Sequence, residues 1–429
     1  MNARCSASYR GVSPIVILII GVVTGLNSRA QNVQRGEWED VLKIVSADVE
    51  NNFYDSHLKG LDWTTLTEET RQRIRNSNNT GQMILAICAL LDKLGDSHTY
   101  FVPPPLTQQA DFGFKAKAFG ADIRIYEIES KGPAVKVGLA VGDKLLSLNR
   151  IPVDRTNISE ILGLIERVVP STSLDAEVLP PGGQAHVVHI AARMIARQEH
   201  QYLDSVWRTA DEQRSLDYRV NFLQRDYGDG ITYVAIPTFD STPDSTYAAI
   251  KKAERSRAVI LDLRGNHGGR VDTELAFLGF FSAESGILSK RISKSRSEDI
   301  RIIPRYSGFG GSIFVLVDSD SGSAAEESTR HLQMVHKALV VGDKTAGKVN
   351  EGRFFPGKIG AQFLMPFGVV VTEAKLVMPD GTELEGHGVI PDLECIPTAE
   401  DLRQQLDPCL DQAIALARKS LLDKSPRTN

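Results

Sequence analysis

The second half of the chain alternates apolar runs with helical segments, and this alternation restricts the possible fold more than any other feature. Apolar runs at 231–239, 258–264, 312–317 and 338–342 are typical of buried strands, and segments with helical patterns separate several of them. Strands that alternate with helices indicate an α/β layer structure. We therefore expect an α/β core over residues 194–400.

The rest of the 429-residue chain divides into further regions. Residues 31–106 space many apolar residues three to four positions apart, which predicts helices. Residues 107–193 contain alternating and short apolar runs, which predict a small strand-rich domain. Residues 401–429 predict a helical tail that is interrupted at Pro408. The expected fold class is therefore a multidomain α/β protein.

The N-terminus has the pattern of an export signal. Arg4 and Arg10 precede an apolar stretch of about a dozen residues, and the small residues Ser28 and Ala30 follow it. A membrane anchor is the alternative interpretation, but the stretch is shorter than the ~20 residues that span a bilayer. We therefore expect residues 1–30 to be a cleaved signal peptide that directs the chain to a periplasm or the outside medium.

Charge and cysteine content exclude several functions. The net charge of −5 gives no electrostatic reason to expect nucleic acid as a partner. Cys5 would leave with the signal peptide, and Cys88, Cys395 and Cys409 remain. Cys395 and Cys409 could pair in an oxidising compartment. No cluster of Cys and His has metal-ligand spacing, so we expect no metal and no other cofactor.

Ser323 lies where an apolar strand meets a helix. The segment "SGSAAE" allows a capping box, in which Ser323 and Glu326 bond each other's backbone N–H groups. The same position suits a nucleophile, because free N–H groups at a helix N-terminus stabilise a developing oxyanion. Gly322 and Ala324 would leave room for a substrate backbone. Capping and catalysis do not exclude each other.

Candidate partners for a nucleophilic serine occur in four other segments. "GDKTAGK" ends in Lys348, and "LGDSHTYF" contains His98. "LEGHGV" contains Glu385, and the turn "NHGG" contains Gly268 and Gly269. Each has an ordinary structural interpretation, as a solvated side chain or a tight turn. A lysine acts as a base only where burial lowers its pKa towards neutrality.

Taken together and in order, these segments resemble one family, the C-terminal processing (tail-specific) serine peptidases with their tricorn-like relatives. The resemblance covers nearly the whole chain after the signal and rests on "DSHTYF", "KGPAVKVGLAVGDKLLSLNRIPV", "ILDLRGNHGG", "SGSAAE", "GDKTAGK" and "EGHGVIPDL". It implies a helical N-terminal region, a PDZ-like domain over 107–193 and a crotonase-like α/β peptidase core. It also implies an oxyanion hole formed by Gly268, Gly269 and Ala324.

The resemblance implies that Ser323 is the nucleophile and leaves its base open. In processing peptidases the base is a lysine, which here is Lys348. In the tricorn-like branch it is a histidine oriented by a glutamate, which here are His98 and Glu385. The chain carries both sets, but Gly352 stands where processing peptidases usually have a glutamine.

The PDZ-like resemblance also predicts a peptide-binding site. Phe112, Gly113 and Phe114 would offer backbone N–H groups to the terminal carboxylate of a peptide, which would then add as a strand to the sheet edge. Val135 and Leu139 would form the floor of the groove. The alternative is that these apolar residues only fill a small core.

The resulting functional prediction is an exported serine endopeptidase that cleaves proteins or peptides through an acyl-enzyme. Its partner would be a protein or peptide substrate with a free C-terminus. The alternative is a non-catalytic ligand- or peptide-binding protein on the same fold. The intact serine with its candidate bases favours the enzyme.

Overall fold

The computed structural model describes residues 31–104, 108–196, 222–305, 307–360 and 365–423. The chain forms two compact units. One comprises Met1–Pro105 with Gly352–Glu373, and the other comprises Leu106–Glu351 with Ala374–Asn429. The predicted signal peptide at 1–30 lies outside the described residues.

Helices dominate the first unit, as the sequence predicts. They are α2 (Gln31–Asn52), the short η1 (Leu58–Gly60), α3 (Trp63–Arg75) and α4 (Thr80–Asp92). Asp62 caps α3 by accepting the N–H of Thr65, and Asn79 caps α4 in the same way. Trp63 donates its indole N–H to the buried hydroxyl of Ser46 at 2.9 Å, which ties α3 to α2.

A distant part of the chain completes this unit. Strand β1 (Tyr100–Val102) pairs antiparallel with β18 (Met365–Val377), and Tyr100 lies opposite Val370. Strand β17 (Glu351–Ile359) also pairs with β18. The sequence prediction of a helical region that ends at residue 106 did not include these strands, because pairing between distant segments leaves no local pattern.

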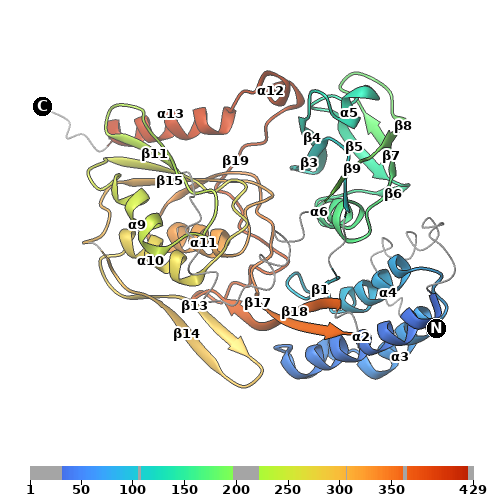
Figure 1. Ribbon diagram of the computed structural model, residues 1–429. Helices are drawn as coiled ribbons and strands as arrows, with labels where there is room; N and C mark the ends of the chain where they lie inside the picture. Colours follow the sequence, from blue (N-terminus) through green and yellow to red (C-terminus); the bar gives the residue numbers. More distant parts are fainter. Residues whose placement is uncertain (1–30, 105–107, 197–221, 306, 361–364, 424–429) are drawn as a thin grey trace, which may run out of the picture. The chain divides into compact units, whose positions relative to one another are not determined.

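The second unit begins with a small sheet, which we call the small-sheet region (residues 108–196). Its sheet has the order β3-β4-β5-β7-β8, so β3 is an edge strand, and helix α6 packs against it (Figure 1). The elements are β2 (Gln108–Asp111), β3 (Phe114–Phe119), β4 (Asp122–Ile128), α5 (Pro133–Lys136), β5 (Lys144–Leu148), β6 (Ile151–Pro152), α6 (Ile158–Gly163), η2 (Leu164–Val168), β7 (Ser173–Leu179), β8 (His186–Ala191) and β9 (Arg193–Ala196).

A six-stranded sheet forms the centre of the second unit. Its order is β10-β11-β12-β15-β16-β19, and all neighbours are parallel except β10 and β11. The strands are β10 (Leu223–Asp226), β11 (Ile231–Ala235), β12 (Ala258–Asp262), β15 (Ser312–Val317), β16 (Leu339–Gly342) and β19 (Leu393–Glu394). The α/β layer structure expected from the alternating pattern is confirmed.

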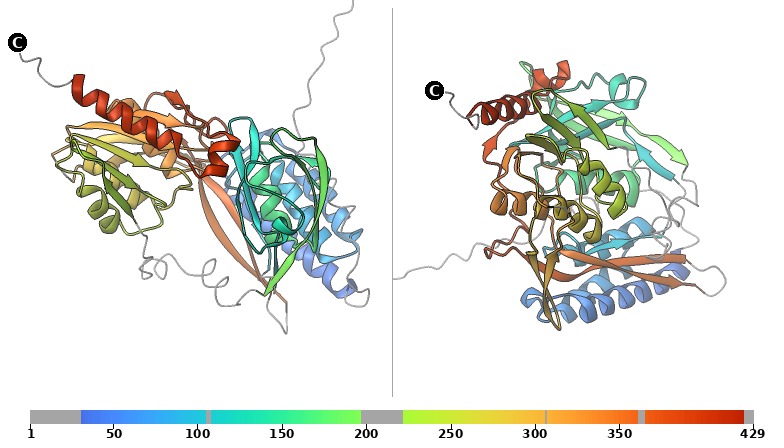
Figure 2. Two further views of the ribbon diagram at one scale, coloured as in Figure 1. Left: turned by 90° about the horizontal axis from the view of Figure 1, so that it is seen from above. Right: turned by 90° about the vertical axis from the view of Figure 1, so that its left-hand side faces the viewer.

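Helices cover both faces of this sheet (Figures 1 and 2). One face packs on α9 (Pro243–Lys251), α10 (Val271–Phe281) and α11 (Ala324–Val335), and the other packs on α13 (Pro408–Asp423). Burial on both faces explains why strands such as β12 are apolar throughout. A hairpin of β13 (Gly286–Ser293) and β14 (Ser297–Ile302) adds to this unit, and the last residues of β18 pair with β13.

The C-terminal segment confirms one prediction and answers a question that the sequence left open. The tail helix is interrupted before Pro408, with α12 (Ala399–Gln404) on one side and α13 on the other. Cys395 and Cys409 form a disulfide, which links the chain after β19 to the first turn of α13. Within the described residues, no helix combines the length and the apolar character needed to cross a bilayer.

Candidate active site

Ser323 occupies a strained turn between β15 and α11. Its φ of 53° and ψ of −125° lie in a region that residues other than glycine seldom adopt, at a cost of about 1–3 kcal/mol. Its N–H donates to the carbonyl oxygen of Lys348 at 2.7 Å, and its side chain is partly exposed. A strained strand-to-helix turn that presents a serine is the geometry used by known serine nucleophiles.

The predicted capping box is present at the start of α11. The carboxylate of Glu326 accepts the N–H of Ser323 at 3.2 Å. The N–H of Glu326 also donates to the backbone carbonyl oxygen of Ser323 at 2.8 Å. The capping interpretation of this segment is therefore confirmed, and the cap helps to hold the strained residue in place.

The Glu326 carboxylate also binds a second loop, which sequence reasoning missed. Its oxygens accept the N–H of Gly347 at 2.8 Å, the N–H of Lys348 at 2.9 Å and the hydroxyl of Thr345. Burial raises the pKa of this fully buried carboxyl, and the hydrogen bonds oppose that rise. Glu326 therefore joins the serine turn to residues 345–348. The capping motif identified the residue, but no local pattern points to its distant partners.

The glycine turn after β12 lies directly against Ser323. Gly268 has a φ of +94°, and a Cβ added there would lie 2.5 Å from the Cβ of Ser323 and 3.0 Å from the N atom of Ala324. Gly269 has a φ of +141°, and a Cβ there would lie 2.3 Å from the N atom of Asp240. Only glycine fits this close approach of two backbone segments.

The backbone N–H of Gly268 has a hydrogen-bond acceptor, whereas those of Gly269 and Ala324 have none in the described structure. Gly268 donates to the side-chain oxygen of Asn266 at 2.8 Å, and the amide group of buried Asn266 in turn donates to the carbonyl oxygen of Ile236. Within the part of the chain that the structure describes, the N–H groups of Gly269 and Ala324 make no hydrogen bond. Ala324 directly follows Ser323 in the chain, and Gly269 directly follows Gly268, the glycine that lies against Ser323.

Lys348 contributes its backbone and its side chain to different contacts. Its carbonyl oxygen accepts the N–H of Ser323, as described above. Its ammonium group lies 3.4 Å from the carboxylate of Glu160 on α6, and the two side chains are 40% and 53% exposed. Among the residues that the structure describes, no hydrogen bond joins the ammonium group of Lys348 to the hydroxyl of Ser323.

Glu385 holds the backbone that follows Lys348. Its Oε2 atom accepts the N–H of Val349 at 2.8 Å and the N–H of Asn350 at 3.1 Å. The next residue, Gly386, donates its N–H to the carbonyl oxygen of Gly347 at 2.8 Å. The two loops that carry Glu385 and Lys348 are therefore connected along their backbones.

His98 belongs to the first unit. Its Nδ1 atom lies 2.8 Å from the hydroxyl of Ser97, and its backbone N–H donates to the carboxylate of Asp96 at 3.1 Å. The side chain is partly exposed.

The predicted peptide-binding residues lie at the start of β3. Phe112 and Phe114 are buried. Gly113 has a φ of +74°, and its N–H already donates to the carboxylate of Asp111 at 2.9 Å. A peptide carboxylate at Gly113 would therefore compete with Asp111. Val135 and Leu139, which were predicted to form the floor of the peptide-binding groove, differ in exposure. Leu139 is buried, whereas Val135 is 40% exposed.

The close approach of Gly268 to Ser323 gives a stability prediction. Gly268→Ala should lower the free energy of unfolding by about 3 kcal/mol, because it adds an overlap with Ser323 to the strain of a positive φ. Gly265→Ala is the matched control, since Gly265 has a φ of +67° but nothing within 4 Å of the added Cβ. It should cost only about 1 kcal/mol. Denaturant unfolding measures both, and equal losses would show that the approach to Ser323 does not matter.

Comparisons with known proteins agree with this geometry. Residues 230–395 match the profile of Peptidase family S41. The chain is 22% identical to carboxyl-terminal-processing peptidase 1 of Arabidopsis thaliana chloroplasts, over 75% of this chain and 64% of that protein. It is 23% identical to the putative tricorn protease homolog 2 of Streptomyces coelicolor, over 91% of this chain and 33% of that protein. The chain thus spans less than two thirds of the length of both relatives.

A solved structure shares the fold. The structure of mature CPAF complexed with lactacystin matches with a TM-score of 0.66 and 15% identity, over 92% of this chain and all of that chain. The resemblance to C-terminal processing and tricorn-like peptidases is therefore confirmed, and the chain carries a domain of Peptidase family S41.

Proposed function

We propose that this protein is an exported serine endopeptidase whose nucleophile is Ser323. The observation that carries the proposal is the strained turn at Ser323, which lies against Gly268 at the N-terminus of α11. A fold keeps a costly backbone conformation where the surrounding structure fixes it, and such positions concentrate at active sites. The helix N-terminus adds a positive potential where an oxyanion would form.

In the proposed reaction, the hydroxyl oxygen of Ser323 attacks the carbonyl carbon of the scissile peptide bond while a base takes the hydroxyl proton. The resulting oxyanion accepts the N–H groups of Gly269 and Ala324. The N–H of Gly268 instead orients the turn through Asn266. Collapse of the intermediate expels the amine, which takes the proton, and leaves an acyl-enzyme that water hydrolyses. One oxyanion donor is worth about 100-fold in rate or more.

Lys348 and His98 are the two candidate bases, and the contacts of Lys348 favour His98. A lysine serves as a base when it is desolvated and lacks a partner anion. The Lys348 side chain is 40% exposed and lies 3.4 Å from Glu160. We therefore favour His98, oriented by Glu385, as the group that removes the proton from Ser323.

The proposal also covers how substrates are selected and where the protein acts. The Arabidopsis relative is named for carboxyl-terminal processing, and we propose that this chain selects substrates by their C-termini. The small-sheet region would act as a PDZ-like domain, with Phe112, Gly113 and Phe114 at its carboxylate-binding turn. The N-terminal signal pattern and the Cys395–Cys409 disulfide support export to an oxidising compartment.

The first prediction of this proposal concerns the nucleophile. Ser323→Ala should abolish cleavage of an unfolded protein substrate and labelling by a fluorophosphonate, because both need the hydroxyl. The fold should survive, since loss of an N-cap serine costs about 1 kcal/mol. Thermal unfolding provides the control. Wild-type cleavage by the alanine variant would show that Ser323 is only a cap, whereas absence of cleavage by wild type itself would favour a binding protein on this fold.

The base can be assigned by parallel substitutions. His98→Ala should lower kcat about 100-fold or more, whereas Lys348→Ala should keep activity within a few-fold. His387→Ala is the control, because this exposed histidine lies two residues after Glu385. A protonated histidine cannot accept a proton, so wild-type activity should also fall as the solution is acidified. The opposite ranking of the two variants would identify Lys348 as the base.

Selection by C-termini predicts dependence on the terminal carboxylate. The full-length Ser323→Ala variant should bind a peptide that ends in an apolar residue about 10-fold more tightly than the same peptide with an amidated end. A carboxylate gains charge-assisted hydrogen bonds that the amide lacks. Fluorescence anisotropy gives both affinities. Equal affinities would contradict carboxylate capture without affecting the assignment of Ser323.

A further inference from the structure

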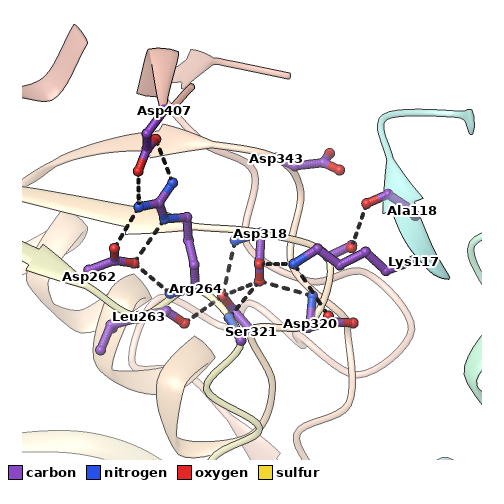
Figure 3. A network of polar contacts seen from close by, with 12 residues as sticks. Lys117, Ala118, Asp262, Leu263, Arg264, Asp318, Asp320, Ser321, Asp343 and Asp407 are labelled. Carbon is purple, nitrogen blue, oxygen red and sulfur yellow. Dashed lines mark hydrogen bonds and ion pairs between the residues drawn. The ribbon is translucent and has the colours of Figure 1, made fainter. Parts of the chain in front are cut away.

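A partly buried cation from the small-sheet region lies beside the loop that carries Ser323. Lys117, on the edge strand β3, places its ammonium group 2.5 Å from the carboxylate of Asp318 and 3.4 Å from that of Asp320 (Figure 3). The three side chains are between 14% and 21% exposed. An ion pair this shielded from water is stronger than a surface pair and costs more to break on one side.

The second oxygen of Asp318 connects the two backbone segments of the candidate active site. Its Oδ1 atom accepts the N–H of Gly265 at 2.9 Å, the N–H of Asp320 at 3.1 Å and the hydroxyl of Ser321 at 3.2 Å (Figure 3). Ser321 also donates its hydroxyl to the carbonyl oxygen of Leu263 at 2.8 Å. Asp318 therefore fixes the loop before Ser323 to the start of the glycine turn.

The ionised form of Asp318 depends on Lys117. Arg264 is nearby in Figure 3, but its guanidinium group binds Asp262 at 2.6 Å and Asp407 at 2.7 Å. Among the described ion pairs, Lys117 is the cation that contacts Asp318. Burial would raise the pKa of the Asp318 carboxyl, but the charge and hydrogen bond of Lys117, together with the backbone N–H groups of Gly265 and Asp320, outweigh burial, and the pKa lies below its ordinary value.

Lys117 is itself held in place from several sides. Its ammonium group lies 5.6 Å from the ring centre of Phe119 and 5.2 Å from that of Tyr126. The adjacent carbonyl oxygen of Ala118 accepts the hydroxyl of Ser319 at 2.7 Å, so the backbone of β3 also contacts the loop. The pKa of Lys117 is raised, because Asp318 and Asp320 outweigh the opposing effect of burial.

We propose that Lys117 is a positioning residue for the peptidase reaction, through which the small-sheet region keeps the Ser323 loop and the glycine turn in register. It acts through Asp318 and does not contact the reacting atoms. The inference rests on the proposed function of Ser323. Without Lys117, Asp318 would protonate or turn towards water, and Gly265, Asp320 and Ser321 would lose a charged acceptor.

The test compares four full-length variants with wild type. Lys117→Met should lower kcat about 10-fold or more and change KM by less than about twofold, because substrate contacts remain. Lys117→Arg should keep most of the activity, since it retains the charge. Lys115→Met is the control, because Lys115 lies on the same strand but pairs with Glu127 at the surface, where both side chains are more than half exposed.

The pH profile and a double variant separate positioning from a loss of folding. In Lys117→Met, Asp318 should protonate at higher pH, so thermal unfolding followed against pH should show stability lost at higher pH than in wild type as the solution is acidified. Lys117→Met with Asp318→Asn removes the unpaired charge at position 318 and keeps an acceptor oxygen there, so it should recover activity and lose that shift. Unchanged kcat and pH profile in Lys117→Met, or a double variant as impaired as the single one, would overturn the inference.

The two proposals fail in different ways. Wild-type cleavage that survives Ser323→Ala removes the basis for both. Cleavage that requires Ser323 but is insensitive to Lys117→Met removes only the positioning role.

Discussion

The candidate active site depends on the buried carboxylate of Glu326. Its oxygens accept three backbone N–H groups, from Ser323, Gly347 and Lys348, and the hydroxyl of Thr345. An unpartnered carboxylate in the interior costs several kcal/mol, and these donors offset that cost. Neither the strained serine turn nor the 345–348 loop can move alone, because either movement would leave a buried charge with fewer partners.

A second, partly buried carboxylate connects the loop before Ser323 to the glycine turn. Asp318 accepts the N–H groups of Gly265 and Asp320, and it has Lys117 as its counter-charge. The difference between the two carboxylates is informative. Glu326 is stabilised by uncharged hydrogen-bond donors of the α/β core, whereas Asp318 also pairs with a cation from another sheet. The backbone around Ser323 is therefore held partly by the small-sheet region.

Local patterns in the sequence predicted the local structure well. The apolar runs at 258–264 and 312–317 form strands, the capping box at Ser323 forms, and the tail breaks before Pro408. Contacts between distant segments were not predictable in this way. In the sequence, Lys117 looks like an ordinary lysine of a half-exposed strand. Its partner Asp318 is 201 positions away, so no local sequence pattern predicts their pairing. The bonds of Glu326 to the 345–348 loop were missed for the same reason.

The first unit is built from two stretches of chain that are far apart in the sequence, so it cannot be completed until the second stretch has been synthesised. Thr99 bonds Thr372 through their hydroxyls at 3.1 Å, although the two are 273 positions apart, and β1 pairs with β18 beside them. At a synthesis rate of about 5–20 residues per second, the N-terminal helices would wait on the order of 10–50 s for this strand. During that time Trp38 and Phe101 lack the apolar partner Phe367 that packs on Phe101 in the finished fold. The first segment to be made is thus among the last to be completed, and it needs protection from aggregation while the rest of the chain is produced.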